Sequence, residues 1–163
     1  MAFRLKKNFL ENKISLLSPE SYRIGIVVSE WHSDITEELY KGAERILLLG
    51  GIKQENIIRK NVPGSFELPL EALRLTKKTD AVICLGCVIK GETDHFYFIS
   101  NTVANGIMNV NLKSKIPVSF GVLTTETIEQ AKERAGGKFG NKGEESALVA
   151  LKMLVPKKID KKK

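Results

Sequence analysis

The chain has 163 residues, enough for one compact domain with a buried core and short for two. Its 26 Lys and Arg against 19 Asp and Glu give a net charge of +7, but much of the excess lies in the two end segments, which argues against a nucleic-acid-binding surface. No apolar run approaches the roughly 18 residues that cross a bilayer, and the N-terminal segment lacks the apolar stretch of a signal peptide, so we expect a cytoplasmic protein with no membrane partner.

The first residues, 1–21, are polar and irregular, and they predict an N-terminal arm. We expect this arm to belong to a single domain over residues 1–163 that ends in a basic tail at 157–163. A regular pattern begins with the apolar run at 23–28, which predicts a buried strand.

A helix is predicted over residues 35–49, after a turn. Its apolar side chains recur at helical spacing and fall on one face, Asp34 is a candidate N-cap with Glu37 three residues later, and the pair Gly50-Gly51 is a candidate stop. The face consists of Ile35, Leu39, Ala43, Ile46 and Leu47.

Strands and helices continue to alternate along the rest of the chain. A strand is predicted over 56–62, and a helix over 66–78 that tolerates Pro69 because this proline lies near its first turn. The apolar run at 81–89 predicts a strand at the centre of a sheet that is covered on both faces. The remaining elements are a helix over 95–113, a strand over 116–123, and two closing helices over 127–135 and 143–154 around a glycine-rich link.

Strands that alternate with helices through short turns predict an α/β protein. We expect a three-layer α/β/α sandwich in which helices cover both faces of a central parallel four-stranded sheet. Sites in such sheets form outside the carboxyl ends of the strands. Four turns meet this condition, at residues 29–34, 62–67, 89–96 and 120–127.

The two cysteines, Cys84 and Cys87, have the spacing of redox and zinc motifs, but their position argues against both. Redox pairs of this kind begin a helix, whereas here both residues fall inside a predicted strand and point to opposite faces. A structural zinc would need four ligands, and His32 and His95 are the only histidines left to supply them. We therefore expect buried, apolar cysteines and no metal site.

The turn at 89–96 combines residues that suit an anion and a proton transfer. A helix that begins near His95 would offer unpaired backbone N–H groups, Gly91 would let a phosphate approach them, and Thr93 would add a hydroxyl. The carboxylates of Glu92 and Asp94 would then have to point away. The alternative is that Thr93 and Asp94 only cap the helix and His95 packs against a neighbour.

Two other turns carry candidate binding residues. Trp31, the only tryptophan, follows a strand end and could stack on a flat heterocycle, although an edge-of-core or oligomer contact is the alternative. Ser65 and Glu67 stand at a helix start, where they could bind a polyol chain, although capping would also explain Ser65.

A cationic pair is predicted near the C-terminus, where Arg134 ends a helix and Lys138 lies in the glycine-rich link. Arginine through its planar fork and lysine as a point charge both suit a phosphate group. The spacing differs from that of a nucleotide P-loop, and no dinucleotide-binding glycine pattern follows any predicted strand.

These motifs resemble one known family. The stretches "GIVVSEWHSDITEELYKGA", "VPGSFELP", "GCVIKGETDHF" and "IPVSFGVLTTETIEQAKERAGGKFGNKGEESALVALKM" are similar, in order and spacing, to those of lumazine synthases. The likeness covers about residues 23–153. It implies a flavodoxin-like form of the three-layer fold.

The resemblance implies a transferase that needs no metal or organic cofactor. It would condense 5-amino-6-(D-ribitylamino)uracil with 3,4-dihydroxy-2-butanone 4-phosphate to 6,7-dimethyl-8-ribityllumazine, phosphate and water, the penultimate step of riboflavin biosynthesis. By motif, His95 would be the proton donor and Arg134 the phosphate-binding arginine. The implied binding positions are Trp31 on the pyrimidine, Ser65, Phe66 and Glu67 on the ribityl chain, Cys87, Val88 and Ile89 along the ring edge, Glu92 and Thr93 on the phosphate, and Phe120 closing the pocket from a neighbouring subunit.

The chain departs from the family pattern in two turns. Glu30, Trp31 and His32 stand where Arg-Phe-Asn-like residues are usual, so an aromatic residue is kept and its two neighbours are replaced. Glu92 stands where a small residue is expected.

The resemblance also implies an oligomer. Family members form pentamers, some of which assemble into sixty-subunit icosahedral shells, and the short link at 136–143 is similar to that of shell-forming members. We expect the arm to cover a neighbour's exposed sheet edge. The expected partners are therefore small-molecule substrates and further copies of the chain, with riboflavin synthase as a further candidate.

Two other classes of function compete with this one. A non-catalytic flavodoxin-like protein that binds flavin or lumazine should lack a competent His95 or Arg134, and this chain has both. RNA binding through the basic ends predicts a steeply salt-dependent affinity that survives deletion of the lysine tail.

Overall fold

The computed structural model describes residues 18–154. The basic tail at 157–163 and most of the predicted arm lie outside the described residues, and only the arm's last part, the 3₁₀ turn η1 (Pro19–Ser21), is described. The elements that follow are β1 (Ile24–Ser29), α2 (Ser33–Leu49), η2 (Gln54–Asn56), β2 (Ile57–Val62), η3 (Ser65–Glu67), α3 (Leu68–Leu75), β3 (Ala81–Ile89), α4 (His95–Ser114), β4 (Val118–Thr125), α5 (Ile128–Glu133), β5 (Ala135–Gly137), β6 (Gly140–Asn141) and α6 (Lys142–Leu154).

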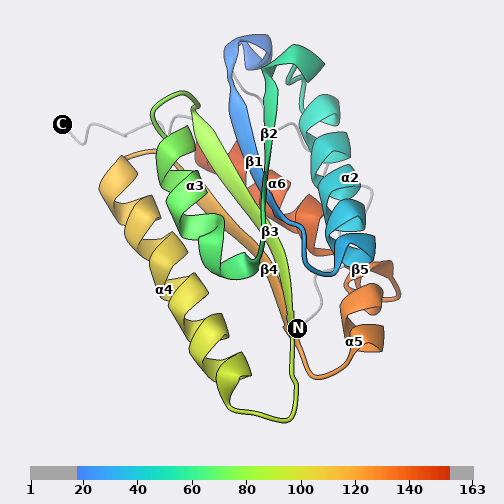
Figure 1. Cartoon of the computed structure of the whole chain (residues 1–163). Helices are drawn as coiled ribbons and strands as arrows, with labels where there is room; N and C mark the ends of the chain where they lie inside the picture. Colours follow the sequence, from blue (N-terminus) through green and yellow to red (C-terminus); the bar gives the residue numbers. More distant parts are fainter. Residues whose placement is uncertain (1–17, 155–163) are drawn as a thin grey trace, which may run out of the picture.

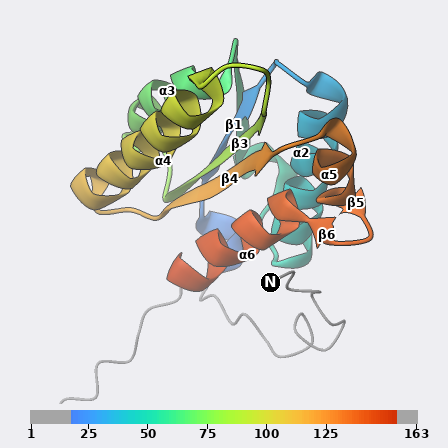
Figure 2. The ribbon, with the colours of Figure 1, turned by 90° about the horizontal axis from the view of Figure 1, so that it is seen from below.

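The central sheet confirms the predicted architecture. Its four strands are parallel and lie in the order β2-β1-β3-β4, so that Val28 of β1 pairs with Asn61 on one side and with Leu85 on the other. Helices α3 and α4 cover one face, and α2, α5 and α6 cover the other (Figures 1 and 2). The result is a three-layer, flavodoxin-like α/β/α sandwich.

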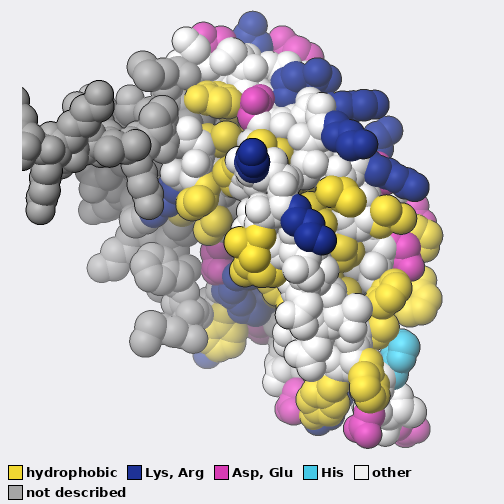
Figure 3. All heavy atoms as spheres, turned by 90° about the vertical axis from the view of Figure 1, so that its left-hand side faces the viewer, with side chains coloured by type: hydrophobic (Ala, Val, Ile, Leu, Met, Phe, Trp, Pro, Cys, Tyr) yellow, Lys and Arg dark blue, Asp and Glu magenta, His cyan; other side chains and the backbone are white. Residues whose placement is uncertain are grey.

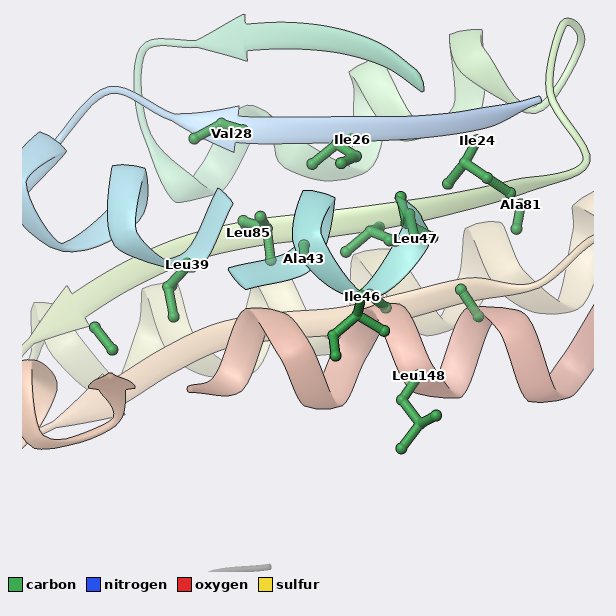
Figure 4. Close-up of a cluster of buried hydrophobic side chains, with 14 of the residues drawn as sticks. Ile24, Ile26, Val28, Leu39, Ala43, Ile46, Leu47, Ala81, Leu85 and Leu148 are labelled. Atoms are coloured by element: carbon green, nitrogen blue, oxygen red, sulfur yellow. The ribbon is translucent and has the colours of Figure 1, made fainter. Parts of the chain in front are cut away.

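Apolar side chains from the strands form a core on each face of the sheet. On the side of α2 and α6, Ile26 and Leu85 pack with Leu39 and Ile46, all fully buried (Figure 4). Burial of one such side chain contributes about 1.5–3 kcal/mol. On the other side, Val27 and its neighbours pack against α3 and α4. The sheet is thus fixed from both faces, which holds the ends of its strands in place.

The two cysteines behave as predicted. Cys84 and Cys87 are free and buried, and they belong to the cores on opposite faces of β3. Burial raises the pKa of both thiols to about 12, so neither is a reactive thiolate near neutral pH.

The start of α2 differs from the prediction, whereas its end agrees with it. The N-cap is His32 and not Asp34, because the chain turns through a left-handed backbone at His32 (φ 57°, ψ 48°) and the helix begins one residue before Asp34. Asp34 lies in the first turn, where its charge favours the helix dipole. At the other end, Gly51 has φ 87°, which confirms the double glycine as the stop.

The glycine-rich link forms a small antiparallel hairpin, β5–β6, in which Ala135 pairs with Asn141. Asn141 then starts α6: its Oδ1 accepts hydrogen bonds from the N–H groups of Gly143 (2.8 Å) and Glu144 (3.2 Å). Its Nδ2 donates to the carbonyl of Glu38 in α2, at 2.8 Å. One buried amide therefore caps α6 and ties it to α2.

Among the helices described, none is both long and apolar enough to span a membrane.

Candidate active site

A cavity of about 410 Å³ lies at the carboxyl ends of β1 and β3, where the sequence predicts the site. Three of the four selected turns line it, and the turn after β4 does not. Nine of the predicted site residues meet there: Trp31, Ser65, Phe66, Glu67, Cys87, Val88, Ile89, Thr93 and His95. They are joined by His32, Pro63, Gly64, Gly91, Phe96 and Ile99.

Backbone hydrogen bonds hold the first turn against the second. The N–H of Glu30 donates to the carbonyl of Val62 at 2.8 Å, and the N–H of Trp31 donates to that of Pro63 at 3.2 Å. These bonds fix the backbone at Trp31, which lines the cavity and is 71% exposed. An apolar ring in this position offers a flat surface on which a heterocycle can stack.

The second turn presents a hydroxyl without a partner. Ser65 Oγ is buried and has no hydrogen-bond partner among the described residues, so capping does not explain this side chain. The cap is supplied by Glu67, whose Oε2 accepts from the N–H of Gly64 at 3.0 Å. A buried hydroxyl without a partner costs about 1–3 kcal/mol of stability.

The third turn confirms the predicted helix start. Helix α4 begins at His95 with Asp94 as its N-cap, and Thr93 Oγ1 accepts a long hydrogen bond of 3.4 Å from the N–H of His95. A Cβ added to Gly91 would meet nothing within 4 Å, so the backbone there is open to an approaching group. Glu92 is exposed and does not line the cavity. Asp94 does not line the cavity either, so neither carboxylate of this turn opposes an anion at the N–H groups of the helix start; the carboxylate in the cavity wall is Glu67 of the second turn.

Three of the predicted site residues, two of them cations, lie outside this cavity. Arg134, Lys138 and Phe120 do not line this cavity. The guanidinium of Arg134 makes a bidentate ion pair with Glu145, at 2.9 and 3.0 Å. The ammonium of Lys138 lies 5.5 Å from the ring centroid of Phe139.

Two residues beside Arg134 were not predicted from the sequence. Glu145 binds Arg134 and also Lys142, whose Nζ lies 3.3 Å from Glu145 Oε2. Burial alone would raise the pKa of Glu145, but hydrogen bonds and charge from Arg134 and Lys142 outweigh it and hold that pKa below 4.5. The carboxylate is therefore ionised at neutral pH, and it brings Lys142 into the group in place of Lys138.

The described residues hold no group of three or more His, Cys, Asp or Glu side chains that could bind a metal ion. The cavity itself offers an imidazole for proton transfer, hydroxyl and amide groups for binding, and an aromatic surface.

Comparison with known proteins points to one family. A family model described as 6,7-dimethyl-8-ribityllumazine synthase matches residues 21–158. The chain is 64% identical to the 6,7-dimethyl-8-ribityllumazine synthase of Cytophaga hutchinsonii over 132 residues. This aligned region covers 80% of this chain and 83% of that protein. The enzyme of the same name from Parabacteroides distasonis is 53% identical over 133 residues, which are 80% of this chain and 83% of that protein. The one from Bacteroides fragilis is 49% identical over 134 residues, which are 81% of this chain and 94% of that protein.

Proposed function

This chain belongs to the 6,7-dimethyl-8-ribityllumazine synthase family, and we propose that its reaction takes place in the cavity between Trp31, Ser65 and His95. The reaction condenses 5-amino-6-(D-ribitylamino)uracil with 3,4-dihydroxy-2-butanone 4-phosphate, and it releases 6,7-dimethyl-8-ribityllumazine, phosphate and water. It is a transferase reaction of riboflavin biosynthesis. The meeting of three strand-end turns at one cavity is the observation that carries the proposed location.

The pyrimidine substrate is assigned to the side of the first two turns. Its ring stacks on the exposed indole of Trp31, and Cys87, Val88 and Ile89 line the ring edge at the end of β3. Its ribityl hydroxyls bind near Ser65, Phe66 and Glu67. Support comes from the cavity wall, to which all three of these residues contribute.

The phosphate substrate is assigned to the third turn. The N–H groups at the start of α4, near Glu92 and Thr93, face an anion that approaches past Gly91. His95 transfers protons as the amine adds to the ketone, water leaves to form an imine, phosphate departs, and the ring closes. Positive charge from Arg134 stabilises the departing phosphate.

We infer that Arg134, Lys138 and Phe120 complete the cavity of a neighbouring subunit, because none of them lines the cavity of its own chain. An apolar surface supports such an assembly. The outer side of α4 exposes Phe98 (71%) and Leu112 (73%), and Figure 3 shows hydrophobic side chains on this face. Exposed apolar side chains gathered on one face commonly mark an interface.

The assembly that we propose is a pentamer. Its further association into a sixty-subunit shell, the docking of the arm on a neighbour and the association with riboflavin synthase stay predictions, as does the cytoplasmic location. Light scattering should give a particle mass near five or sixty times the 18.2 kDa of one chain. A lone monomer that turns over both substrates would contradict the shared cavity.

A steady-state assay tests the assigned roles. With both substrates, formation of the lumazine is followed by its absorbance and phosphate release is measured separately, against a buffer blank because the condensation can proceed unaided. We expect His95→Gln to lower kcat by roughly 10²-fold or more. Arg134→Ala should raise the KM of the butanone phosphate at least about tenfold. Unchanged rates in both variants would reject these roles.

A further inference from the structure

The guanidinium of Arg134 is held at its end and along one edge. Its Nη1 donates to Glu145 Oε1 at 2.9 Å and to the carbonyl of Phe139 at 2.6 Å, and its Nη2 donates to Glu145 Oε2 at 3.0 Å. A guanidinium has five N–H donors, so these bonds use three of them. The two N–H groups that have no partner in residues 18–154, one on Nη2 and the one on Nε, lie on the same edge of the guanidinium plane and form a second fork.

The backbone next to this ion pair is also fixed. The N–H of Lys142 donates to the carbonyl of Arg134 at 2.9 Å, so the β5–β6 hairpin closes directly behind the arginine. The side chains of Arg134 and Glu145 are 23% and 17% exposed, which places the pair at the edge of the fold and not in bulk solvent. Both ends of the long arginine side chain are therefore restrained before any ligand arrives.

We propose that Glu145 is a positioning residue for the phosphate substrate, which it never touches. It occupies the end of the guanidinium. The N–H groups on Nε and Nη2 of Arg134 are therefore left as a preformed bidentate binding site for phosphate oxygens. This inference rests on the proposed function, in which Arg134 binds the phosphate. Without Glu145, binding must also order a flexible side chain, and that cost falls on the phosphate substrate alone.

A neighbouring residue supplies the matched control. Glu144 lies beside Glu145, is 19% exposed, and also pairs with an arginine, Arg45 of α2. Glu144→Gln and Glu145→Gln therefore each remove one carboxylate charge from an Arg–Glu pair on the same helix, although Arg45 is more exposed (59%) than Arg134 (23%) and Glu145 also pairs with Lys142. Only Glu145 has an arginine with an assigned role in binding.

The experiment compares the KM of each substrate, kcat and the melting temperature in the two variants. Glu145→Gln should raise the KM of the butanone phosphate about tenfold and leave that of the pyrimidine within about twofold. Glu144→Gln should change neither KM, although both variants lose some thermal stability. If both KM values stay unchanged in Glu145→Gln, the pair is only structural and the proposal is overturned.

Two further variants keep the outcome decisive. Glu145→Asp retains the charge on a shorter side chain, so it should restore part of the lost affinity, and it replaces Glu145→Gln in the comparison if that variant does not fold. Arg134→Ala, measured in parallel, separates the phosphate-binding role of Arg134 from the positioning role of Glu145. If it leaves the KM of the butanone phosphate unchanged, the proposed function fails; if it raises that KM and neither Glu145 variant does, only the positioning role fails.

Discussion

Ser65 and Gly86 are in direct contact, and the glycine makes the contact possible. A Cβ added to Gly86 on β3 would lie 2.6 Å from Ser65 Oγ and 3.0 Å from Cδ1 of Leu68. The short turn η3 can therefore lie close to the strand, which places Ser65 in the wall of the cavity with its hydroxyl buried.

Gly86→Ala tests this contact. The new methyl must push Ser65 and Leu68 away from β3, which should cost roughly 1–3 kcal/mol of stability and raise the KM of the pyrimidine more than that of the butanone phosphate. Substrate kinetics and thermal unfolding of the same preparation give both quantities. Gly91→Ala is the control for stability, because a Cβ there meets nothing within 4 Å. Equal losses of stability in Gly86→Ala and Gly91→Ala would show that the close packing of Gly86 against Ser65 does not contribute to stability.

A second prediction concerns Asn141, which caps α6 and ties it to α2. Asn141→Ala removes acceptors from the N–H groups of Gly143 and Glu144 and a donor from the carbonyl of Glu38. We expect a loss of about 2 kcal/mol or more. Thr127→Ala removes the acceptor of the Gln130 N–H at the start of α5 and a hydrogen bond to the exposed carboxylate of Glu129, and it should lose about 1 kcal/mol. Melting temperatures at one protein concentration compare the two, because assembly adds to apparent stability.

Local patterns were enough to predict the sheet and its helices. The run from Ala81 to Cys87 is buried residue for residue, as expected of a strand covered on both faces, and the apolar face of α2 is buried as well. The same reasoning failed at Asp34. A left-handed N-cap at His32 has no strong sequence signal, whereas an aspartate followed by a glutamate three residues later imitates a capping pattern.

The cavity was largely predictable because the carboxyl ends of parallel strands meet at one edge of the sheet. The environment of Arg134 could not be predicted from the sequence. Lys142 and Glu145 reach it only because a hairpin with three glycines, which have little strand propensity, reverses the chain at residues 137–140. The spacing of Arg134 and Glu145 matches no familiar motif, so the sequence drew attention to Lys138 instead.

A third prediction follows from the buried thiols. Because the pKa of Cys84 and of Cys87 is about 12, neither should react with a disulfide reagent in the native protein near neutral pH, and both should react after unfolding in guanidinium chloride. The unfolded thiols ionise near 9.0, so between that pH and about 12 the folded state binds more protons. This contribution to stability is therefore lost as the pH rises through that window. Fast labelling of either native thiol would contradict the burial.

The last prediction concerns His32, the second imidazole at the cavity. His32 has a left-handed backbone, its side chain makes no capping hydrogen bond, and it follows Trp31, which the proposed function places on the pyrimidine. An imidazole there can offer one donor and one acceptor to the amide edge of a uracil ring. We therefore expect His32→Gly to raise the KM of the pyrimidine several-fold and to leave that of the butanone phosphate nearly unchanged.

Lys115 provides the matched control for this variant, because its φ of 63° also lies in the left-handed region and it does not line the cavity. Glycine relieves the same backbone strain at both positions, so His32→Gly and Lys115→Gly should shift the melting temperature in the same direction and by similar amounts. Only the former removes a group from the cavity. His32→Asn, which tolerates this backbone and keeps a donor and an acceptor, should retain more pyrimidine affinity than His32→Gly. If all three variants bind the pyrimidine like the parent protein, the imidazole faces the cavity without contacting the ring.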